Sequence, residues 1–166
     1  MSNYLRGSLR HIIQNSPSGM LFTAAEIGVA DALNVKSWVA LGDPFDFKEI
    51  VLIDNTDQLY HIECINKFVS NFPFARFLNM SSIEAAEKFP DEYFDFIYID
   101  GDHSYLGVCA DLATWQNKVK KGGFIAGHDY DVDPGFCVNR AVDGFAASKN
   151  TEVVKLHTEF VIKRTW

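Results

Sequence analysis

The sequence predicts an α/β fold with a doubly wound, mostly parallel sheet, and three observations support this prediction. Short apolar runs alternate along the chain with longer segments of helical spacing, which is typical of β-α-β units. Two runs, residues 93–99 and 122–127, are largely apolar, as expected of strands that are buried on both faces of a sheet. Acids and histidines directly follow both runs, and ligands of such sheets collect at the carboxyl ends of strands.

The first third of the chain is predicted to hold two helices and two strands. Residues 2–15 place apolar side chains on one helical face, and the proline and glycine within 16–19 end this helix. An apolar run over 21–28 predicts the first strand, and residues 31–41 follow with helical spacing. The second strand, 49–54, contains four consecutive apolar residues and ends in an acid.

The central elements continue the alternation of helices and strands. A helix is expected over 57–70, and its inner stripe is predicted to hold Leu59, Ile62, Ile65, Phe68 and Val69. A short strand at 74–78 and a short helix at 82–87 then lead to the largely apolar strand at 93–99.

The C-terminal part is predicted to complete the sheet. A helix over 105–119 connects the two largely apolar strands, and a further helix covers 136–147. Residues 152–156 and 159–163 are expected to form a closing antiparallel, hairpin-like pair of strands.

Length and charge narrow the possible classes of protein. We expect an N-terminal helical segment over 1–20 and one domain over 21–166, because 166 residues suffice for one substantial core. The net charge of -7 disfavours nucleic acid or an anionic membrane surface as the main partner. The chain has no run as long as a membrane span and no signal-peptide-like apolar segment, so a cytoplasmic location is expected.

With this order of elements, the chain resembles class I S-adenosylmethionine-dependent methyltransferases. The resemblance is greatest to the family whose fourth strand reads F-D-x-I-x-I-D-G-D-H-S-Y and whose fifth reads G-G-x-I-x-G-H-D-Y. These motifs stand at Phe94–Tyr105 and Gly122–Tyr130, and residues 139–145 match the helix that the family places next. The resemblance spans roughly residues 22–164. It implies a Rossmann-like, seven-stranded, mostly parallel sheet with an antiparallel last strand and helices on both faces, and S-adenosylmethionine as the cofactor.

Two residues at the ends of the first two strands are the main candidates for cofactor binding. Gly28 lets the backbone approach a ligand closely. The family usually carries a second glycine near Ala30 or Ala32, where this chain has alanines. Asp54 ends the second strand, where an acid accepts hydrogen bonds from ribose hydroxyls, although it could instead cap the next helix.

Three further residues are expected near the cofactor. Glu26 is expected to contact its methionine end through water. The resemblance places Ser81 and Ser82 where the family binds adenine. The alternative is that these serines cap the helix that follows, with Glu84 nearby.

Asp100 is the central catalytic candidate, because it emerges at the sheet edge beside the expected sulfonium. In metal-assisted relatives an acid after strand four and two consecutive ligands after strand five hold Mg²⁺, and Asp100, His128 and Asp129 occupy those positions. The imidazole of His128 makes Mn²⁺ a candidate as well as Mg²⁺. A metal-free alternative uses His103 or His128 as general base. In a third interpretation, Asp102 and His103 only cap and brace the next helix.

These features predict a methyltransferase that acts on a small-molecule acceptor, at an oxygen, with or without a divalent cation (Mg²⁺ or Mn²⁺). One alternative is a degenerate domain with weak or no cofactor binding, which Ala30 and Ala32 would fit. Another is an NAD-dependent oxidoreductase, which the missing G-x-G-x-x-G motif disfavours. The N-terminal helix favours a homodimer, and neither nucleic acid nor a membrane is expected as a partner.

Overall fold

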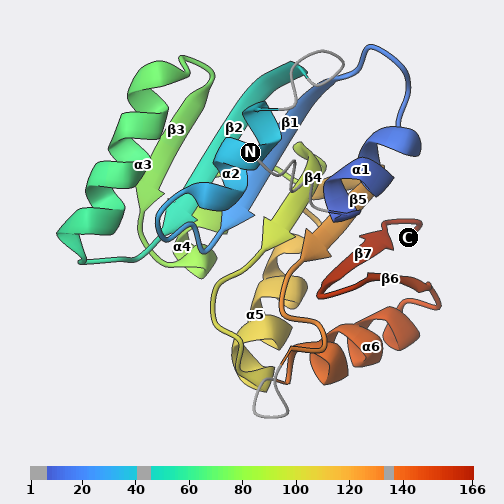
Figure 1. Cartoon of the computed structure of the whole chain (residues 1–166). Coiled ribbons are helices and arrows are strands. Elements are labelled where there is room, and N and C mark those ends of the chain that lie inside the picture. The colour runs from blue at the N-terminus through green and yellow to red at the C-terminus, as the bar shows by residue number, and fades with distance from the viewer. Residues whose placement is uncertain (1–6, 41–45, 133–136) are drawn as a thin grey trace.

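A seven-stranded sheet with helices on both faces forms the fold (Figure 1), in a computed structural model that describes residues 7–40, 46–132 and 137–166. The strand order is β3-β2-β1-β4-β5-β7-β6. The first five strands run parallel, and β7 pairs antiparallel with both β5 and β6. The predicted fold class is therefore confirmed. The strands are β1 (Leu21–Ile27), β2 (Asp46–Asp54), β3 (Ala75–Asn79), β4 (Phe94–Ile99), β5 (Val119–Gly127), β6 (Val153–Leu156) and β7 (Glu159–Lys163).

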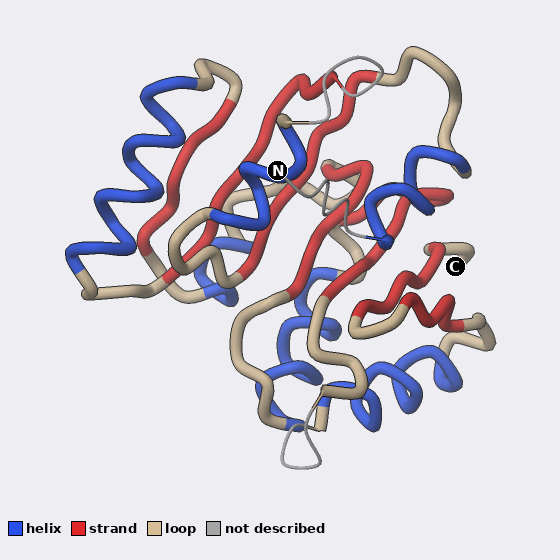
Figure 2. The backbone as a smooth tube through the Cα atoms, in the orientation of Figure 1, coloured by secondary structure: helices blue, strands red, loops and turns tan. Residues whose placement is uncertain are grey.

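The helices divide between the two faces of the sheet because alternate strand residues point to opposite sides (Figure 2). One core lies under α1, α2 and α3 and the other under α4, α5 and α6. The helices are α1 (Gly7–Gln14), α2 (Leu33–Val39), α3 (Leu59–Asn71), α4 (Ser82–Ala86), α5 (Tyr105–Trp115) and α6 (Val138–Ser148). Residues 2–6, 41 and 136 of the predicted helices lie outside the described residues.

Two details of the predicted elements are wrong. Leu59 was expected on the inner stripe of α3, but it is the first residue of that helix and 75% exposed, whereas Ile65 and Phe68 are buried. Helix α5 ends at Trp115 rather than at 119. Val119 instead begins β5, where it pairs with Phe94 of β4.

A buried carboxylate, that of Asp95, fixes the start of the two central strands. Its Oδ2 accepts a hydrogen bond of 2.8 Å from the backbone N–H of Thr23, where the β1–β2 register shifts. Its Oδ1 lies 2.7 Å from Nζ of Lys120 in β5. Asp95 thus accepts a hydrogen bond from the N–H of Thr23, which the irregular β1–β2 pairing leaves without a partner in the sheet.

A second buried carboxylate, that of Glu159 in β7, attaches α1 to the sheet. It accepts hydrogen bonds from the backbone N–H and the hydroxyl of Ser8, at 3.1 and 2.9 Å, and from the Tyr98 hydroxyl at 2.8 Å. An acid at the first turn of a helix is favourable because unpaired N–H groups point toward it. No helix in the described part of the chain has the length and apolar character that a membrane span needs.

Candidate active site

A cavity of about 590 Å³ opens at the carboxyl ends of β1, β2, β3 and β4. Its walls include most of the predicted cofactor-binding residues, namely Gly28, Asp54, Ser81, Ser82 and Asp100. The volume falls in the range of about 300–1,000 Å³ that is typical of small-molecule and cofactor sites. The carboxyl edge of the sheet thus carries a pocket where the sequence predicted one.

Gly28 lies where the chain after β1 passes close to the chain after β4. Its φ is 81°, in the left-handed region, and its N–H donates a hydrogen bond of 2.9 Å to the carbonyl of Ile53. A Cβ added at Gly28 would overlap the backbone of Asp100 and Gly101. Glycine is therefore required here both by the backbone conformation and by the lack of space.

The two alanines that follow also adopt the left-handed backbone. Ala30 has a φ of 47° and Ala32 a φ of 62°, in the region where glycine carries no steric cost. The turn after β1 therefore has the backbone conformation that glycine would favour, although alanines occupy these positions. Ala30 is exposed, whereas Ala32 is completely buried.

Asp54 holds this turn in place from the end of β2. Its Oδ2 accepts hydrogen bonds from the backbone N–H groups of Val29 and Ala30, at 2.8 and 2.9 Å. No described residue donates a hydrogen bond to Oδ1, and Asp54 lines the cavity. The predicted alternative of a helix cap does not apply, since α3 begins five residues later and Gln58 is its N-cap.

Ser81 has the predicted capping role, whereas adenine binding by Ser81 and Ser82 stays a prediction. Ser81 is the N-cap of α4 in a capping box with Glu84, and the hydrogen bonds from Ser81 lower the pKa of the Glu84 carboxyl. Both serines also line the cavity. Ser82 Oγ donates a hydrogen bond to Oδ1 of Asp111.

Asp111 lines the same cavity, and the sequence analysis missed it. It lies on α5 and is only 6% exposed, and burial raises the pKa of its carboxyl group. A signal was present in the sequence. Asp111 occupies the buried stripe of its helix between Val108 and Leu112, where an acid is rare without a reason.

Glu26 stands apart from the other cofactor candidates. It is 1% exposed within β1, and its Oε1 accepts a hydrogen bond of 2.7 Å from the amide of Asn34. It is not among the described residues that line the cavity. Its contact with a cofactor stays a prediction.

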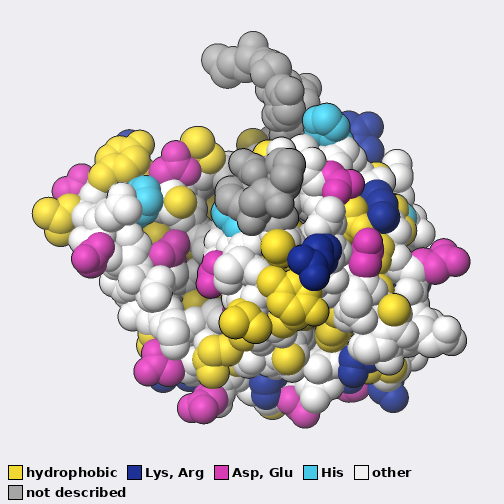
Figure 3. Space-filling model, turned by 90° about the horizontal axis from the view of Figure 1, so that it is seen from below, with side chains coloured by type: hydrophobic (Ala, Val, Ile, Leu, Met, Phe, Trp, Pro, Cys, Tyr) yellow, Lys and Arg dark blue, Asp and Glu magenta, His cyan; other side chains and the backbone are white. Residues whose placement is uncertain are grey.

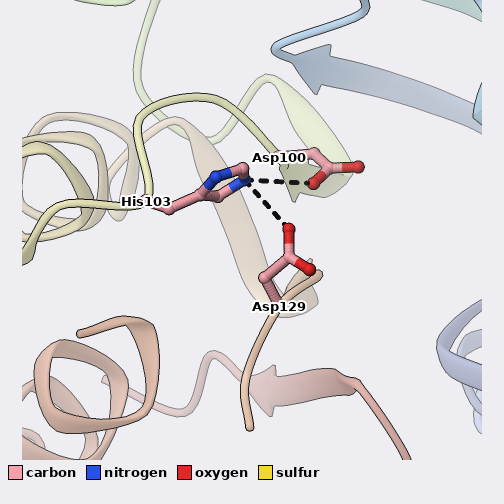
Figure 4. Close-up of side chains that lie close together, drawn as sticks. All are labelled: Asp100, His103 and Asp129. Atoms are coloured by element: carbon pink, nitrogen blue, oxygen red, sulfur yellow. Dashed lines mark ion pairs between the residues drawn. The ribbon is translucent and has the colours of Figure 1, made fainter. Parts of the chain in front are cut away.

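A second group of side chains lies at the ends of β4 and β5 (Figure 4). Nε2 of His103 lies 3.0 Å from Oδ2 of Asp129 and 3.7 Å from Oδ1 of Asp100. The contact with the Asp100 carboxylate raises the pKa of His103, and the charge of Asp129 adds to this, while desolvation opposes it. Asp129 has a φ of 56°, an uncommon backbone conformation that is typical of functional turns.

The predicted metal ligands are brought together only in part. Asp100 and Asp129 meet, but the histidine between them is His103 rather than His128. His128 is held elsewhere, because its Nδ1 lies 3.0 Å from the other oxygen of Asp129 and its Nε2 lies 2.9 Å from the Thr158 hydroxyl. Asp100, His103 and Asp129 each offer one possible metal-ligand atom, and these three atoms lie within 4.8 Å of one another. This set could therefore hold a cation.

The bracing role predicted for Asp102 and His103 holds for Asp102 alone. Asp102 accepts hydrogen bonds of 2.8 and 3.0 Å from the N–H and hydroxyl of Ser104. Ser104, not Asp102, is the N-cap of α5. His103 turns instead toward the two site acids (Figure 4).

Apolar side chains surround the carboxyl edge of the sheet. Figure 3 looks at this face and shows hydrophobic side chains at its surface. The large exposed ones that follow strand ends are Leu33, Leu59, Tyr60, Ile83, Tyr105, Leu106 and Val132. We call this set the apolar rim.

The sequence profile of a methyltransferase domain family matches residues 27–130, which is more than half of the chain and includes both motif-bearing strand ends. The chain belongs to this family. It is therefore a methyltransferase, and the matched segment runs from the last residue of β1 to Tyr130 just after β5. No curated protein matches the chain.

Solved structures share the fold of this methyltransferase at low sequence identity. A Clostridium thermocellum protein, provisionally described as an rRNA methylase, is 14% identical with a TM-score of 0.72 and covers 100% of this chain and 98% of its own. A Staphylococcus aureus protein, provisionally described as a caffeoyl-CoA O-methyltransferase, is 13% identical with a TM-score of 0.70. The match covers 93% of this chain and 80% of the S. aureus protein. MycE methyltransferase, from the mycinamycin biosynthetic pathway, was solved with Mg, SAH and mycinamycin VI. It is 15% identical with a TM-score of 0.65, and the match covers 94% of this chain but 48% of MycE.

Proposed function

We propose that this methyltransferase uses S-adenosylmethionine to methylate an oxygen of a small-molecule acceptor. One observation carries the proposal: Asp100 borders the cavity on one side and belongs to the cluster with His103 and Asp129 on the other. A donor in the cavity and an acceptor at the cluster would therefore meet beside the same carboxylate. Close positioning of the two reactants is the main requirement of a transfer from sulfonium to oxygen.

The residues of the cavity fit the proposed cofactor. S-adenosylmethionine would supply the methyl group on its positively charged sulfur. Gly28 lets the chain after β1 pass close to the backbone of Asp100 at the cavity wall, and Asp54 keeps its Oδ1 available for ribose hydroxyls while Oδ2 fixes the turn. The left-handed Ala30 and Ala32 keep the backbone course that glycines would give. This last point weighs against the degenerate-domain alternative.

His103 is the proposed general base. Its Nε2 faces the carboxylates of Asp129 and Asp100 and carries its proton toward them, so the other ring nitrogen would take the proton from the acceptor hydroxyl. The two carboxylates would then stabilise the imidazolium that forms. We favour His103 over His128 because His103 lies against both Asp100 and Asp129, whose charges stabilise an imidazolium, whereas His128 contacts Asp129 and the Thr158 hydroxyl. The His103→Gln variant should lose about 10²–10⁴-fold in kcat, while His128→Gln should lose much less.

A divalent cation at the cluster is the second candidate, favoured by the convergence of two carboxylates and an imidazole. Such a mixed donor set suits Mn²⁺ as well as Mg²⁺, and a bound cation would lower the pKa of the acceptor hydroxyl. His103 would then be a ligand and could not also be the base. Mn²⁺ titration by calorimetry distinguishes the two. The cation proposal expects binding that Asp100→Ala and His103→Ala abolish and that His128→Ala keeps.

A small acceptor, rather than RNA, is supported by the charge and by the apolar rim. The net charge of -7 opposes a phosphate backbone. Tyr105, Leu106 and Val132 of the rim follow the same strands that carry the cluster, and they offer contact to an acceptor with an apolar part. Formation of S-adenosylhomocysteine should therefore be stimulated by hydroxylated aromatic compounds and not by RNA.

Calorimetric titration with S-adenosylhomocysteine and with NAD tests the cofactor. We expect S-adenosylhomocysteine to bind and NAD not to bind. Asp54→Ala should weaken the binding at least tenfold, since a charge-assisted hydrogen bond is worth about 1.5–3 kcal/mol. Asp91→Ala, an exposed acid away from the cavity, is the matched control. Binding of NAD alone would favour the oxidoreductase, and no binding of either ligand would favour the degenerate domain.

A further inference from the structure

The turn between β6 and β7 lies beside the chain that follows β5. Strand β7 runs antiparallel to β5, and Phe160 near its start pairs with Gly127 at the end of β5. Thr158 in the turn, two positions before Phe160, therefore lies at the carboxyl edge of the parallel strands. The hairpin of β6 and β7 forms the side of the sheet away from β3 (Figure 1). This topology brings a residue of the C-terminal hairpin to the side chains at the ends of β4 and β5.

Thr158 contacts both neighbours of Asp129 in the chain. Its hydroxyl lies 2.9 Å from Nε2 of His128, and its carbonyl oxygen accepts a hydrogen bond of 3.0 Å from the backbone N–H of Tyr130. Asp129 itself has a φ of 56°, an uncommon conformation for a residue other than glycine. Such a conformation persists only where its surroundings hold it, and here Thr158 holds the residue before and the residue after.

The contacts of His128 indicate which of its ring nitrogens carries the proton. Nδ1 lies 3.0 Å from Oδ1 of Asp129, and an ionised carboxylate can only accept, so the proton belongs on Nδ1. In a neutral imidazole the other nitrogen is an acceptor, and the Thr158 hydroxyl is placed to donate to it. The remaining oxygen of Asp129, Oδ2, lies 3.0 Å from Nε2 of His103. These contacts form a chain in the order Thr158, His128, Asp129 and His103.

We propose that Thr158 is a positioning residue: its hydroxyl donates to Nε2 of His128 and fixes the ring proton on Nδ1, which holds the Asp129 carboxylate toward His103. The inference rests on the proposed function, in which His103 is the general base. Residues behind a site orient the groups that do the chemistry through hydrogen bonds of this kind. Without the hydroxyl, the proton of His128 is free to move to Nε2. Nδ1 would then turn a lone pair toward the carboxylate, and Asp129 would lose the contact that orders it.

NMR of the histidine ring nitrogens tests these contacts in the isotope-labelled, ligand-free protein, with EDTA at about pH 8.5, where free imidazole is neutral. The wild-type spectrum should show His128 with its proton on Nδ1 alone. Thr158→Val keeps the carbonyl and removes the hydroxyl, so a form of His128 with the proton on Nε2 should appear, and the signals of His103 should shift. Thr158→Ser keeps the hydroxyl and should give the wild-type spectrum.

Methyl transfer to catechol, a hydroxylated aromatic acceptor, tests the consequence for the reaction. Thr158→Val should lower kcat about 2- to 10-fold, the range expected when one neutral hydrogen bond is lost, and Thr158→Ser should restore it. The KM for S-adenosylmethionine should stay the same, because Thr158 is not among the described residues that line the cavity.

Thr151→Val is the matched control. It removes a hydroxyl from the other end of the same hairpin, where Thr151 donates to the carbonyl of Lys163 at 3.4 Å. This variant should keep both the histidine spectrum and the kcat of the wild-type protein.

A proton on Nε2 of His128 in the wild-type protein would overturn the proposal without any variant, even if Thr158→Val fails to fold. An unchanged His128 spectrum in a folded Thr158→Val would overturn it as well, and so would a wild-type kcat in that variant. Failure of S-adenosylhomocysteine to bind the wild-type protein would instead reject the proposed function. The spectra of the ligand-free protein would still decide whether Thr158 orders the two histidines.

Discussion

Nε2 of His103 lies 3.0 Å from Oδ2 of Asp129, so the two chain segments that follow β4 and β5 meet through one imidazole–carboxylate contact. Nδ1 of His128 occupies the other oxygen of the same carboxylate. Asp129 therefore positions both histidines of the site, and only His103 also reaches Asp100.

The pKa of His103 makes the stability of the protein depend on pH. Since the contact with the Asp100 carboxylate raises this pKa in the folded state, it stabilises the fold most when the imidazole is protonated. The stabilisation is complete below the unfolded pKa of about 6.5 and is lost as the pH rises through the higher folded value.

Urea unfolding of the wild-type protein and of His103→Gln, in the presence of EDTA and from about pH 5 to pH 9, measures this contribution. We expect the difference in free energy of unfolding to shrink as the pH increases. A difference that stays constant, or grows with pH, would contradict the assignment.

Replacing Gly28 by alanine should destabilise the protein strongly. The left-handed backbone and the overlap with the Asp100 carbonyl both oppose a Cβ, at a combined cost of about 2–4 kcal/mol. Gly122 has the same φ of 81° but no atom within 4 Å of an added Cβ, so Gly122→Ala should cost only about 1–2 kcal/mol. Equal losses in thermal unfolding of the two variants would show that the close approach of Asp100 has no energetic effect.

Replacing Ala30 by glycine should stabilise the protein by about 0.5–1 kcal/mol, because it relieves a left-handed alanine at an exposed position. Ala32→Gly relieves the same strain but removes a completely buried methyl group, which is worth about 0.8 kcal/mol. The second variant should therefore be close to neutral. Chemical denaturation of both variants checks the order, and a more stable Ala32→Gly than Ala30→Gly would refute it.

Replacing Asp95 by alanine should cost about 1–3 kcal/mol, since the N–H of Thr23 would be left buried without a partner. Lys120 contributes little to this loss because its side chain is 44% exposed and can be solvated. Asp91→Ala, which removes an exposed partner of Lys118, should change the stability by no more than about 1 kcal/mol. Equilibrium unfolding measures both variants, and equal effects would exclude the proposed role of the Thr23 hydrogen bond.

The sequence predicted the order of strands and helices because each depends on a local pattern of apolar residues. The sequence also placed Asp54, Asp100 and Asp129 at the carboxyl edge, since the position of a residue after a strand follows from the strand itself. It did not show which histidine lies between Asp100 and Asp129. That depends on Thr158, which follows β6 and lies 30 residues beyond His128.

Asp111 was missed for a related reason. The buried stripe of α5 signals an unusual acid, but its partner is Ser82, the first residue of α4, which no pattern within α5 reveals. The extent of α5 was overestimated because the chain leaves the helix after Trp115, and the amino groups of Lys118 and Lys120 bind Asp91 and Asp95. Tertiary contacts decided each of these points.

The main-chain hydrogen bonds of the sheet continue past the ends of its strands, into the residues that carry the site. The N–H of Asp100 donates to the carbonyl of Ile27 at 2.8 Å, and the N–H of His128 donates to that of Ile99 at 3.2 Å. These hydrogen bonds fix the backbone at the site before a ligand binds. Binding therefore costs little conformational entropy of the backbone. Substrate preference could therefore change through the surrounding side chains, while the spacing of the site acids stays set by the strands.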